Sequence, residues 1–227
     1  MDFELTDENR MFREAIRNFG QKEVAPLVDE AEETGVFPRQ LFKKAAEQGF
    51  LCPRYPVEMG GGGGDKVTEC IMVEEMNRVN AGIAASLMAQ SGLATQPIYN
   101  YGSEEQKEKF LIPAIQGDKV GAFGLTEPNA GSDAASIKTT AVRDGDSYII
   151  NGTKIFITNG PFCDYVIVAA YTDPSKRGVG INLFIVEKGT PGFSVSRKLD
   201  KVGNRSIETG ELVFEDCRVP VKNMIGE

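Results

Sequence analysis

The spacing of apolar residues changes near Gly117, and this change limits the fold more than any other feature of the sequence. Before it, from Thr6 to about Tyr101, apolar residues recur at helical spacing. After it, short runs rich in Val, Ile, Phe and Tyr are broken by Gly, Asn and Asp at roughly ten-residue intervals, as in strands joined by tight turns. Helices do not alternate with strands, so a parallel dinucleotide-binding sheet is not expected. We predict an α+β protein, with an all-helical domain over 1–118 followed by an antiparallel β-barrel or sandwich domain over 119–227.

Local end signals place the helices of the first half. Thr6 is the expected N-cap of a first helix that runs into the low thirties. A short second helix has Pro38 in its first turn and ends at Gly49, which can adopt the left-handed conformation of a C-cap. Further helices are expected at 66–79, 82–100 and 103–116, the last opened by a capping box of Ser103 and Gln106.

The segment Glu58–Asp65 contains a run of glycines that suggests a phosphate-binding loop. No strand precedes it, and it lacks both the GxGxxG and the GxxxxGK[ST] spacing. A flexible loop between two helices is therefore the preferred interpretation.

Two dipeptides favour consecutive β-hairpins in the second half. Asp144-Gly145 separates the expected strand 137–143 from 148–150, and Asn151-Gly152 separates 148–150 from 154–157. Both dipeptides suit turns that need positive φ. Further strands are expected at 165–171, 182–187, 193–197 and 211–214, which gives about eight strands in a small barrel or sandwich.

Charge and composition exclude several classes of protein. The net charge is −8, which argues against a nucleic-acid partner, because phosphates are bound by clustered Lys and Arg. The first ten residues are acidic and no apolar run reaches membrane-spanning length, so neither a targeting peptide nor membrane insertion is expected, and we predict a cytoplasmic protein. The end of the sequence lacks a capped terminal element, which suggests a fragment or a truncated subunit.

The absence of histidine removes much catalytic chemistry. With no His in the chain, Ser-His-Asp hydrolysis, histidine acid–base catalysis and His-dependent zinc sites are excluded, and no metal site is expected. The four cysteines are scattered without a CxxC pair, which favours free, mostly buried thiols over a disulfide framework.

Two segments of the β half have the most specific pattern in the chain. They are Phe123–Asp133, FGLTEPNAGSD, and Lys154–Gly160, KIFITNG. In order and spacing they resemble the two flavin segments of the acyl-CoA dehydrogenase family. The likeness continues through Phe184–Gly189, Gly203–Pro220 and, earlier in the chain, Tyr101–Lys107, so that it covers nearly all of the sequence.

The resemblance implies an FAD cofactor held by both segments. A flavin that accepts hydride at N5 gains negative charge toward N1 and O2, so its site needs hydrogen-bond donors along that edge. By resemblance, Leu125 and Thr126 meet the pyrimidine side and N5, while Thr158 approaches from the second segment. Phe156 packs on the ring, at a position where the family commonly has Trp. Taken singly, the threonines also fit ordinary strands. The expected cofactor-binding residues are Phe123, Leu125, Thr126, Gly131, Ser132, Phe156, Ile157 and Thr158.

The substrate implied by the resemblance is an acyl-CoA thioester. Ser132 is expected to touch it, and the loop residues Lys176 and Arg177 are expected to contact its CoA part, although a solvated surface pair is the favoured explanation of these two residues taken alone. Ser86, Ala89 and Leu93 share one helical face at the position that forms the floor of the acyl pocket in the family. Small residues there leave room for a medium, branched or cyclic acyl group, or they only permit close packing of helices, and both interpretations stay open.

The implied reaction is α,β-dehydrogenation, in which a carboxylate removes the α-proton and the β-hydrogen passes as hydride to flavin N5. Family members take this base from a C-terminal helical domain outside 1–227, so no catalytic residue is assigned. Glu127 lies inside the flavin motif but is followed by Pro128, and we interpret it as a structural turn residue. An electron-transfer flavoprotein as acceptor and a homotetramer are implied by resemblance alone. The alternatives are an acyl-CoA oxidase, a desulfinase, or a non-catalytic subunit that binds acyl-CoA or flavin.

Overall fold

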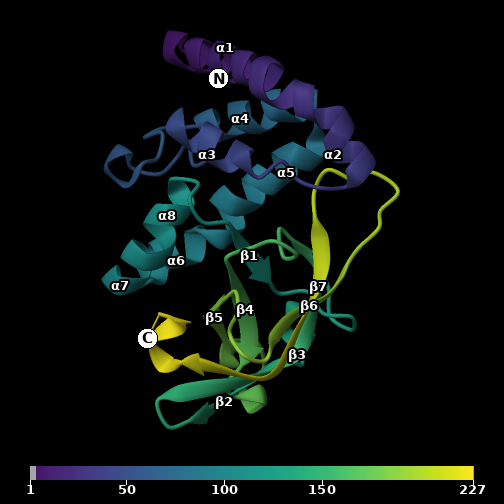
Figure 1. The fold of residues 1–227 in the computed structure, drawn as a ribbon. Coiled ribbons are helices and arrows are strands. Elements are labelled where there is room, and N and C mark those ends of the chain that lie inside the picture. Colours follow the sequence, from purple (N-terminus) through teal and green to yellow (C-terminus); the bar gives the residue numbers. More distant parts are fainter. Residues whose placement is uncertain (1–3, 227) are drawn as a thin grey trace.

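The computed structural model describes residues 4–226, and its N-terminal half is helical (Figure 1). The first helix follows the prediction closely. The side chain of Thr6 accepts a hydrogen bond from the N–H of Asn9, and α1 (Asp7–Phe19) continues through a π-helical turn and a short 3₁₀ turn into α2 (Val28–Thr34). Gly35 ends this run at φ 69°, in the left-handed conformation that glycine adopts without steric cost.

The remaining helices also agree with the prediction, except that π-helical turns over Gln90–Ala94 and Lys107–Leu111 interrupt two of them. They are α3 (Gln40–Glu47), α4 (Lys66–Val79), α5 (Ala81–Ala89), α6 (Gln96–Tyr101), α7 (Glu104–Gln106) and α8 (Ile112–Ile115). The helix expected at 82–100 is divided into α5 and α6 by a π-helical turn over Gln90–Ala94. Pro97, which has no N–H, lies in the first turn of α6, and the Thr95 hydroxyl donates to the carbonyls of Gln90 and Ser91 (both 2.9 Å).

The glycine run is an interhelix loop, but its glycines serve close packing rather than freedom of movement. The N–H groups of Gly61, Gly62, Gly63 and Gly64 each donate to a backbone carbonyl between residues 52 and 56. A Cβ atom on Gly61 would lie 2.2 Å from the carbonyl oxygen of Tyr55, a distance that no real side chain tolerates.

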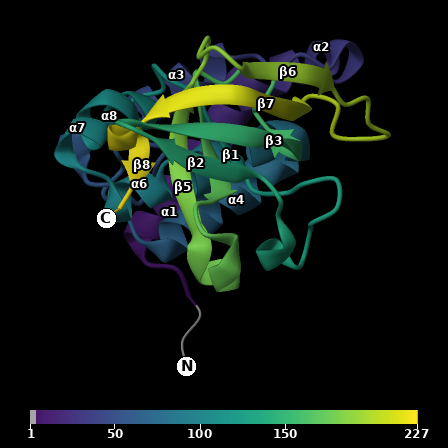
Figure 2. The same cartoon turned by 90° about the horizontal axis from the view of Figure 1, so that it is seen from below.

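The second half forms one eight-stranded, mostly antiparallel sheet (Figure 2). Its strands are β1 (Gly121–Gly124), β2 (Thr140–Asp144), β3 (Ser147–Thr158), β4 (Tyr165–Tyr171), β5 (Ile181–Glu187), β6 (Phe193–Lys198), β7 (Thr209–Pro220) and β8 (Met224–Ile225). Their order is β6-β7-β3-β2-β4-β5-β8, and β1 pairs in parallel with β4. The α+β fold class is confirmed, but the sheet is open rather than closed into a barrel, since β6 and β8 do not pair within residues 4–226.

The hairpin predicted at Asn151-Gly152 is wrong, whereas the one at Asp144-Gly145 is confirmed. β3 runs without a turn through Asn151, which faces two residues of β7, Glu215 and Asp216, in a β-bulge. The Asn151 side chain accepts from the Asp216 N–H at 2.8 Å and donates to its carboxylate at 3.2 Å. The asparagine that indicated a turn therefore stabilises a bulge between two long strands.

One core joins the helices to the sheet. β4 is buried along its whole length, and its residues alternate between two sides. Tyr165 and Ile167 pack with the helices, while Val166 and Val168 pack with residues of β3 and β7 on the other side. The last helix ends at Ile115 and β1 begins at Gly121, but the division into domains 1–118 and 119–227 stays a prediction.

The described residues contain neither a membrane-spanning helix nor a candidate metal site. Within residues 4–226 no helix is long and apolar enough to cross a membrane, and no group of His, Cys, Asp and Glu is arranged to hold a metal ion. All four cysteines are free thiols, of which Cys70 is exposed and the others are buried.

Candidate functional site

A cavity of about 270 Å³ lies where the end of α5 meets the ends of β1 and β3. We call it the first cavity. It brings together six of the eight predicted cofactor-binding residues and two of the three helix residues predicted to form the floor of the acyl pocket. Its lining consists of Ala89, Leu93, Phe123, Leu125, Thr126, Phe156, Ile157 and Thr158. Residues more than thirty positions apart in the sequence thus meet at one site.

The two motif segments are joined by hydrogen bonds on consecutive residues. The N–H of Ile155 donates to the carbonyl of Thr126 at 2.9 Å. The ammonium group of Lys154 donates to the carbonyl of Leu125 at 3.0 Å. These contacts hold the end of β1 against β3 and so fix one wall of the first cavity.

A second bulge presents Phe156 to solvent. Ile155 and Phe156 of β3 face the single residue Glu211 of β7. Phe156 adopts φ 62°, which is rare for a bulky residue, and its side chain is 64% exposed although it belongs to a strand of a mainly buried sheet. A bulge of this kind re-aims a side chain, and here it leaves an aromatic face open at the cavity.

The residue after the end of β3, Asn159, also has a positive φ, and it ties the end of the strand to the helices. Asn159 is fully buried at φ 63°, and its N–H donates to the carbonyl of Glu208. Its side chain accepts from the Ser86 hydroxyl at 2.5 Å and donates to the Ser86 carbonyl at 3.1 Å. Ser86 is therefore buried against Asn159 and does not line the first cavity, so Ser86, Ala89 and Leu93 do not present one common face to it.

A buried ion pair lies behind the first cavity. The Glu127 carboxylate accepts from the Lys154 ammonium at 2.7 Å and from the Thr139 hydroxyl and N–H at 2.5 and 3.0 Å. It also accepts from the N–H of Lys138 at 2.6 Å. Burial alone raises the pKa of Glu127, but these hydrogen bonds outweigh it and lower the pKa below the usual value. Glu127 is thus a structural carboxylate, in agreement with its interpretation as a turn residue.

Sequence reasoning did not single out Lys154 as a structural partner of Glu127. Its side chain is 0% exposed, and burial lowers its pKa while Glu127 opposes this shift. The available signal was a lysine at the start of an otherwise apolar strand segment, Lys154–Ile157, where an inward-facing charge needs a partner.

The other predicted residues lie on two adjoining exposed loops outside the first cavity. Gly131 and Ser132 are exposed, and the next residue, Asp133, pairs with Arg177 at 3.5 Å across the loops. Lys176 pairs with Asp173 at 3.3 Å, and the side chains of Lys176 and Arg177 are 67% and 75% exposed. Ser132 and the two cations therefore lie on neighbouring segments.

A second, larger and mainly apolar cavity of about 600 Å³ lies between α4 and the α5 region. It shares Ala89, Leu93 and Thr158 with the first cavity, so the two adjoin. The other residues that line it are Glu69, Cys70, Met72, Val73, Glu74, Ala85, Met88, Ser91 and Gly92. The sequence did not single these out, because helical periodicity does not separate a pocket face from a packing face.

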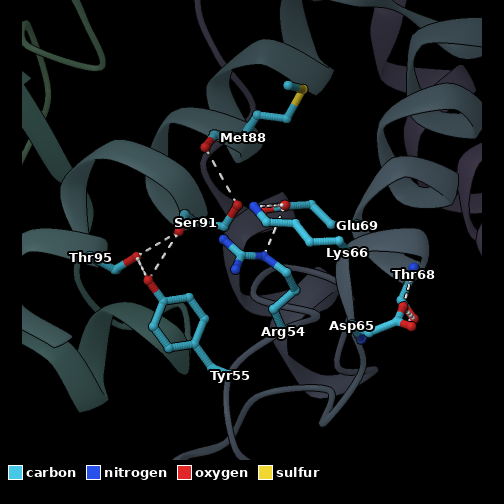
Figure 3. A network of polar contacts seen from close by, with 9 residues as sticks. All are labelled: Arg54, Tyr55, Asp65, Lys66, Thr68, Glu69, Met88, Ser91 and Thr95. Carbon is cyan, nitrogen blue, oxygen red and sulfur yellow. Dashed lines mark hydrogen bonds and ion pairs between the residues drawn. The ribbon is translucent and has the colours of Figure 1, made fainter. Parts of the chain in front are cut away.

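Polar contacts support one end of the second cavity (Figure 3). Arg54 and Lys66 both reach the Glu69 carboxylate, at 2.8 and 2.9 Å. The Tyr55 hydroxyl donates to the Ser91 carbonyl at 3.1 Å. These contacts fix the start of α4 and the π-helical turn after α5 relative to each other.

Comparison with known proteins decides the family. The models of the N-terminal and the middle domain of acyl-CoA dehydrogenases match residues 6–118 and 122–217. The chain belongs to the acyl-CoA dehydrogenase family. Among its relatives, it is 46% identical over 227 residues to the short-chain specific acyl-CoA dehydrogenase of Clostridium acetobutylicum, and the match covers 100% of this chain and 60% of that protein.

Solved structures of this family have the same fold. Butyryl-CoA dehydrogenase from Megasphaera elsdenii superimposes with a TM-score of 0.93 at 45% identity, covering 100% of this chain and 60% of that one. A glutaryl-CoA dehydrogenase from Mycobacterium smegmatis, described in complex with FADH2, superimposes with a TM-score of 0.92 at 34% identity, covering 98% and 56%. This chain therefore spans about 60% of the length of the Clostridium relative, and its match covers 56% of the Mycobacterium glutaryl-CoA dehydrogenase.

Proposed function

We propose that this chain forms the flavin-binding part of an enzyme that oxidises an acyl-CoA thioester between its α- and β-carbons, with FAD as cofactor. The observation that supports this proposal most strongly is the first cavity, in which six predicted cofactor residues from two distant segments meet beside the exposed ring of Phe156. Family membership and the relative described with FADH2 support the same cofactor.

The residues of the first cavity fit a flavin chemically. Phe156 offers an aromatic face for a planar ring, and the threonines Thr126 and Thr158 offer hydroxyl donors beside it. Leu125 and Phe123 supply apolar walls. When bound, the flavin would accept hydride from the substrate at N5. The role of the protein is to hold donors along one edge of the ring and to exclude water from its face.

The second cavity is the proposed site of the acyl group. It is apolar, and it adjoins the first cavity through Ala89, Leu93 and Thr158, so an acyl chain bound there reaches the flavin side. The names of two relatives, which specify short-chain and butyryl substrates, favour a short acyl group. Ser132, Lys176 and Arg177, on the adjoining exposed loops, are the proposed contacts of the CoA part.

The proton acceptor is proposed to come from outside these 227 residues. No carboxylate lines the first cavity within the described residues, and Glu127 is occupied by four hydrogen bonds that lower its pKa, which makes it a poor base. The two carboxylates of the second cavity are already paired with cations, Glu69 with Arg54 and Lys66, and Glu74 with Arg13 and Arg78. The longer relatives contain further sequence that this chain does not span. We also propose that an electron-transfer flavoprotein accepts the electrons and that the protein forms a homotetramer, both on the basis of the family resemblance. A cytoplasmic location is proposed from the sequence.

The decisive experiment expresses the chain with its natural continuation and measures bound flavin by its visible absorbance. Anaerobic addition of butyryl-CoA is expected to bleach that absorbance. A preparation that reconstitutes with no flavin contradicts the proposal. Flavin that binds but is not bleached by acyl-CoA thioesters of any length indicates a non-catalytic subunit, and rapid reoxidation by oxygen indicates an oxidase.

A further inference from the structure

The ion pair of Lys154 and Glu127 lies directly behind the Leu125–Thr126 peptide of the first cavity. The aliphatic part of the Lys154 side chain packs against Gly124, because a Cβ atom added to Gly124 would lie 3.4 Å from the Lys154 Cγ. From there its ammonium group reaches both the Leu125 carbonyl, at 3.0 Å, and the Glu127 carboxylate, at 2.7 Å. One buried cation therefore contacts the two residues that flank Thr126.

Peptide geometry gives this contact a direction. The described chain contains no cis peptide, and in a planar trans peptide the C=O and the N–H point in opposite directions. Because the Leu125 carbonyl points toward Lys154, the N–H of Thr126 in the same peptide points away from Lys154. Thr126 lines the first cavity, so this orientation aims its N–H to the side on which a cofactor edge would lie.

The next peptide, Thr126–Glu127, is fixed at both its carbonyl and its N–H, so the Thr126 N–H is the group whose direction depends on Lys154. The carbonyl of Thr126 accepts from the N–H of Ile155, and the N–H of Glu127 donates to the carbonyl of Ala130. Glu127 is held in turn by Thr139 and by the N–H of Lys138. A buried ammonium needs a compensating charge, so the carboxylate keeps Lys154 charged and in one position.

We propose that the Lys154–Glu127 pair is a positioning device that orients the Leu125–Thr126 peptide so that its N–H donates to the electron-accepting edge of the flavin. This inference rests on the proposed flavin site. Neither side chain touches the cofactor. The pair acts through a single peptide group, and the flavin's affinity and reduction potential depend on that group.

The test compares the double variant Lys154→Met/Glu127→Gln with the parent in the chain that carries its natural continuation. The double variant removes both charges together, so that no unpaired buried ion remains. Glu75→Gln is the matched control, because Glu75 is a buried carboxylate that pairs with Arg17 between α1 and α4 and lines neither cavity. Free FAD is titrated into each apoprotein, and the midpoint potential of bound flavin is measured by anaerobic reduction.

The double variant is expected to bind FAD at least tenfold more weakly and to shift the midpoint potential to more negative values, because one donor to the reduced flavin is lost. The control is expected to lose thermal stability without either change. An affinity within twofold of the parent, together with an unchanged potential, overturns the proposal. If the double variant does not fold, Glu127→Gln alone is measured by the same two readouts and the same limits apply. A parent that binds no FAD contradicts the flavin site itself.

Discussion

Phe156 combines an exposed aromatic ring with a backbone conformation that suits glycine. At φ 62° an L-residue is strained by about 1 kcal/mol, and its ring, 64% exposed, gains little from burial. We expect Phe156→Gly to be more stable than Phe156→Ala by about 1 kcal/mol, because only glycine relieves the strain. Both variants are expected to lose flavin affinity to a similar extent.

Urea unfolding and FAD titration of the two variants check this expectation separately. Equal stabilities would show that the conformation of Phe156 costs no free energy. Unchanged FAD affinity in both variants would show that the ring does not contact the cofactor.

Glu32 is one of the carboxylates through which acid is expected to lower stability. Burial alone raises its pKa, but hydrogen bonds from Ser206 (2.6 Å), Asn80 (3.0 Å) and the N–H of Arg205 (2.9 Å) lower it to about 2. A carboxyl group whose folded pKa is depressed stabilises the fold above its unfolded pKa and loses that effect as the pH falls through the folded pKa. The contribution is therefore complete above about pH 5 and is lost between about pH 4.5 and 2.

The matching variant is Glu32→Gln. Allowing for solvent screening of this partly exposed group, we expect it to cost about 1 to 2 kcal/mol at pH 7 and progressively less below pH 4.5. Urea unfolding at pH 7, 4 and 3 measures the difference. A difference that does not change with pH contradicts the assignment of the acid response to Glu32.

At the scale of elements, the loop over Gly60–Gly64 shows most clearly how a segment depends on its neighbours. Gly61→Ala is expected to destabilise the protein by about 1 to 3 kcal/mol, because its Cβ would meet the Tyr55 carbonyl oxygen at 2.2 Å and the backbone must move. The matched control is Gly92→Ala, in the π-helical turn, where a Cβ meets nothing within 4 Å. The control is expected to gain up to about 1 kcal/mol, since alanine is the better helix former. Thermal unfolding of both variants tests this, and equal melting temperatures would contradict the packing of the loop.

At the scale of the whole molecule, Gln90 connects the helices to the sheet. It is fully buried, its amide donates to the carbonyls of Ala114 (2.9 Å) and Lys119 (2.8 Å), and its side-chain carbonyl accepts from the N–H of Gly121 at 2.8 Å. Gln90→Met keeps the shape but leaves the Lys119 carbonyl and the Gly121 N–H without their partner, whereas the Ala114 carbonyl still accepts from the Gly117 N–H, so we expect a loss of about 3 kcal/mol. Gln21→Met, at an exposed helical position, is the control and is expected to change stability by less than about 0.5 kcal/mol.

Because one core contains residues of both halves, the helices and the sheet of the Gln90→Met variant are still expected to unfold in a single transition. Urea unfolding followed by far-ultraviolet and near-ultraviolet circular dichroism checks both the loss and the cooperativity. Two separate transitions in the parent protein would show that the shared core does not couple its halves.

The sequence by itself determined most of the helices and strands, because the signals for these are local, but the short strands β1 and β8 were not predicted. The N-cap at Thr6, the capping box at Ser103 and the apolar periodicity of 66–79 each act within a few residues of their own position. The two motif segments likewise indicated the family before any contact was known. Asn151-Gly152 failed as a turn signal because its outcome depended on Asp216, sixty-five residues further along the chain.

Only the tertiary structure decided how the parts of the site meet. The pairing of Lys154 with Glu127, the burial of Ser86 against Asn159 and the exposure of Phe156 each depend on bulges and contacts between distant residues. No local pattern specifies such contacts. A lysine or serine in the same local sequence can also lie in solvent, and it is buried only when a distant segment of the chain packs over it and excludes water. The sequence thus determined which residues belong to the two segments, and the packing of β1 against β3 decided which of them face a cavity.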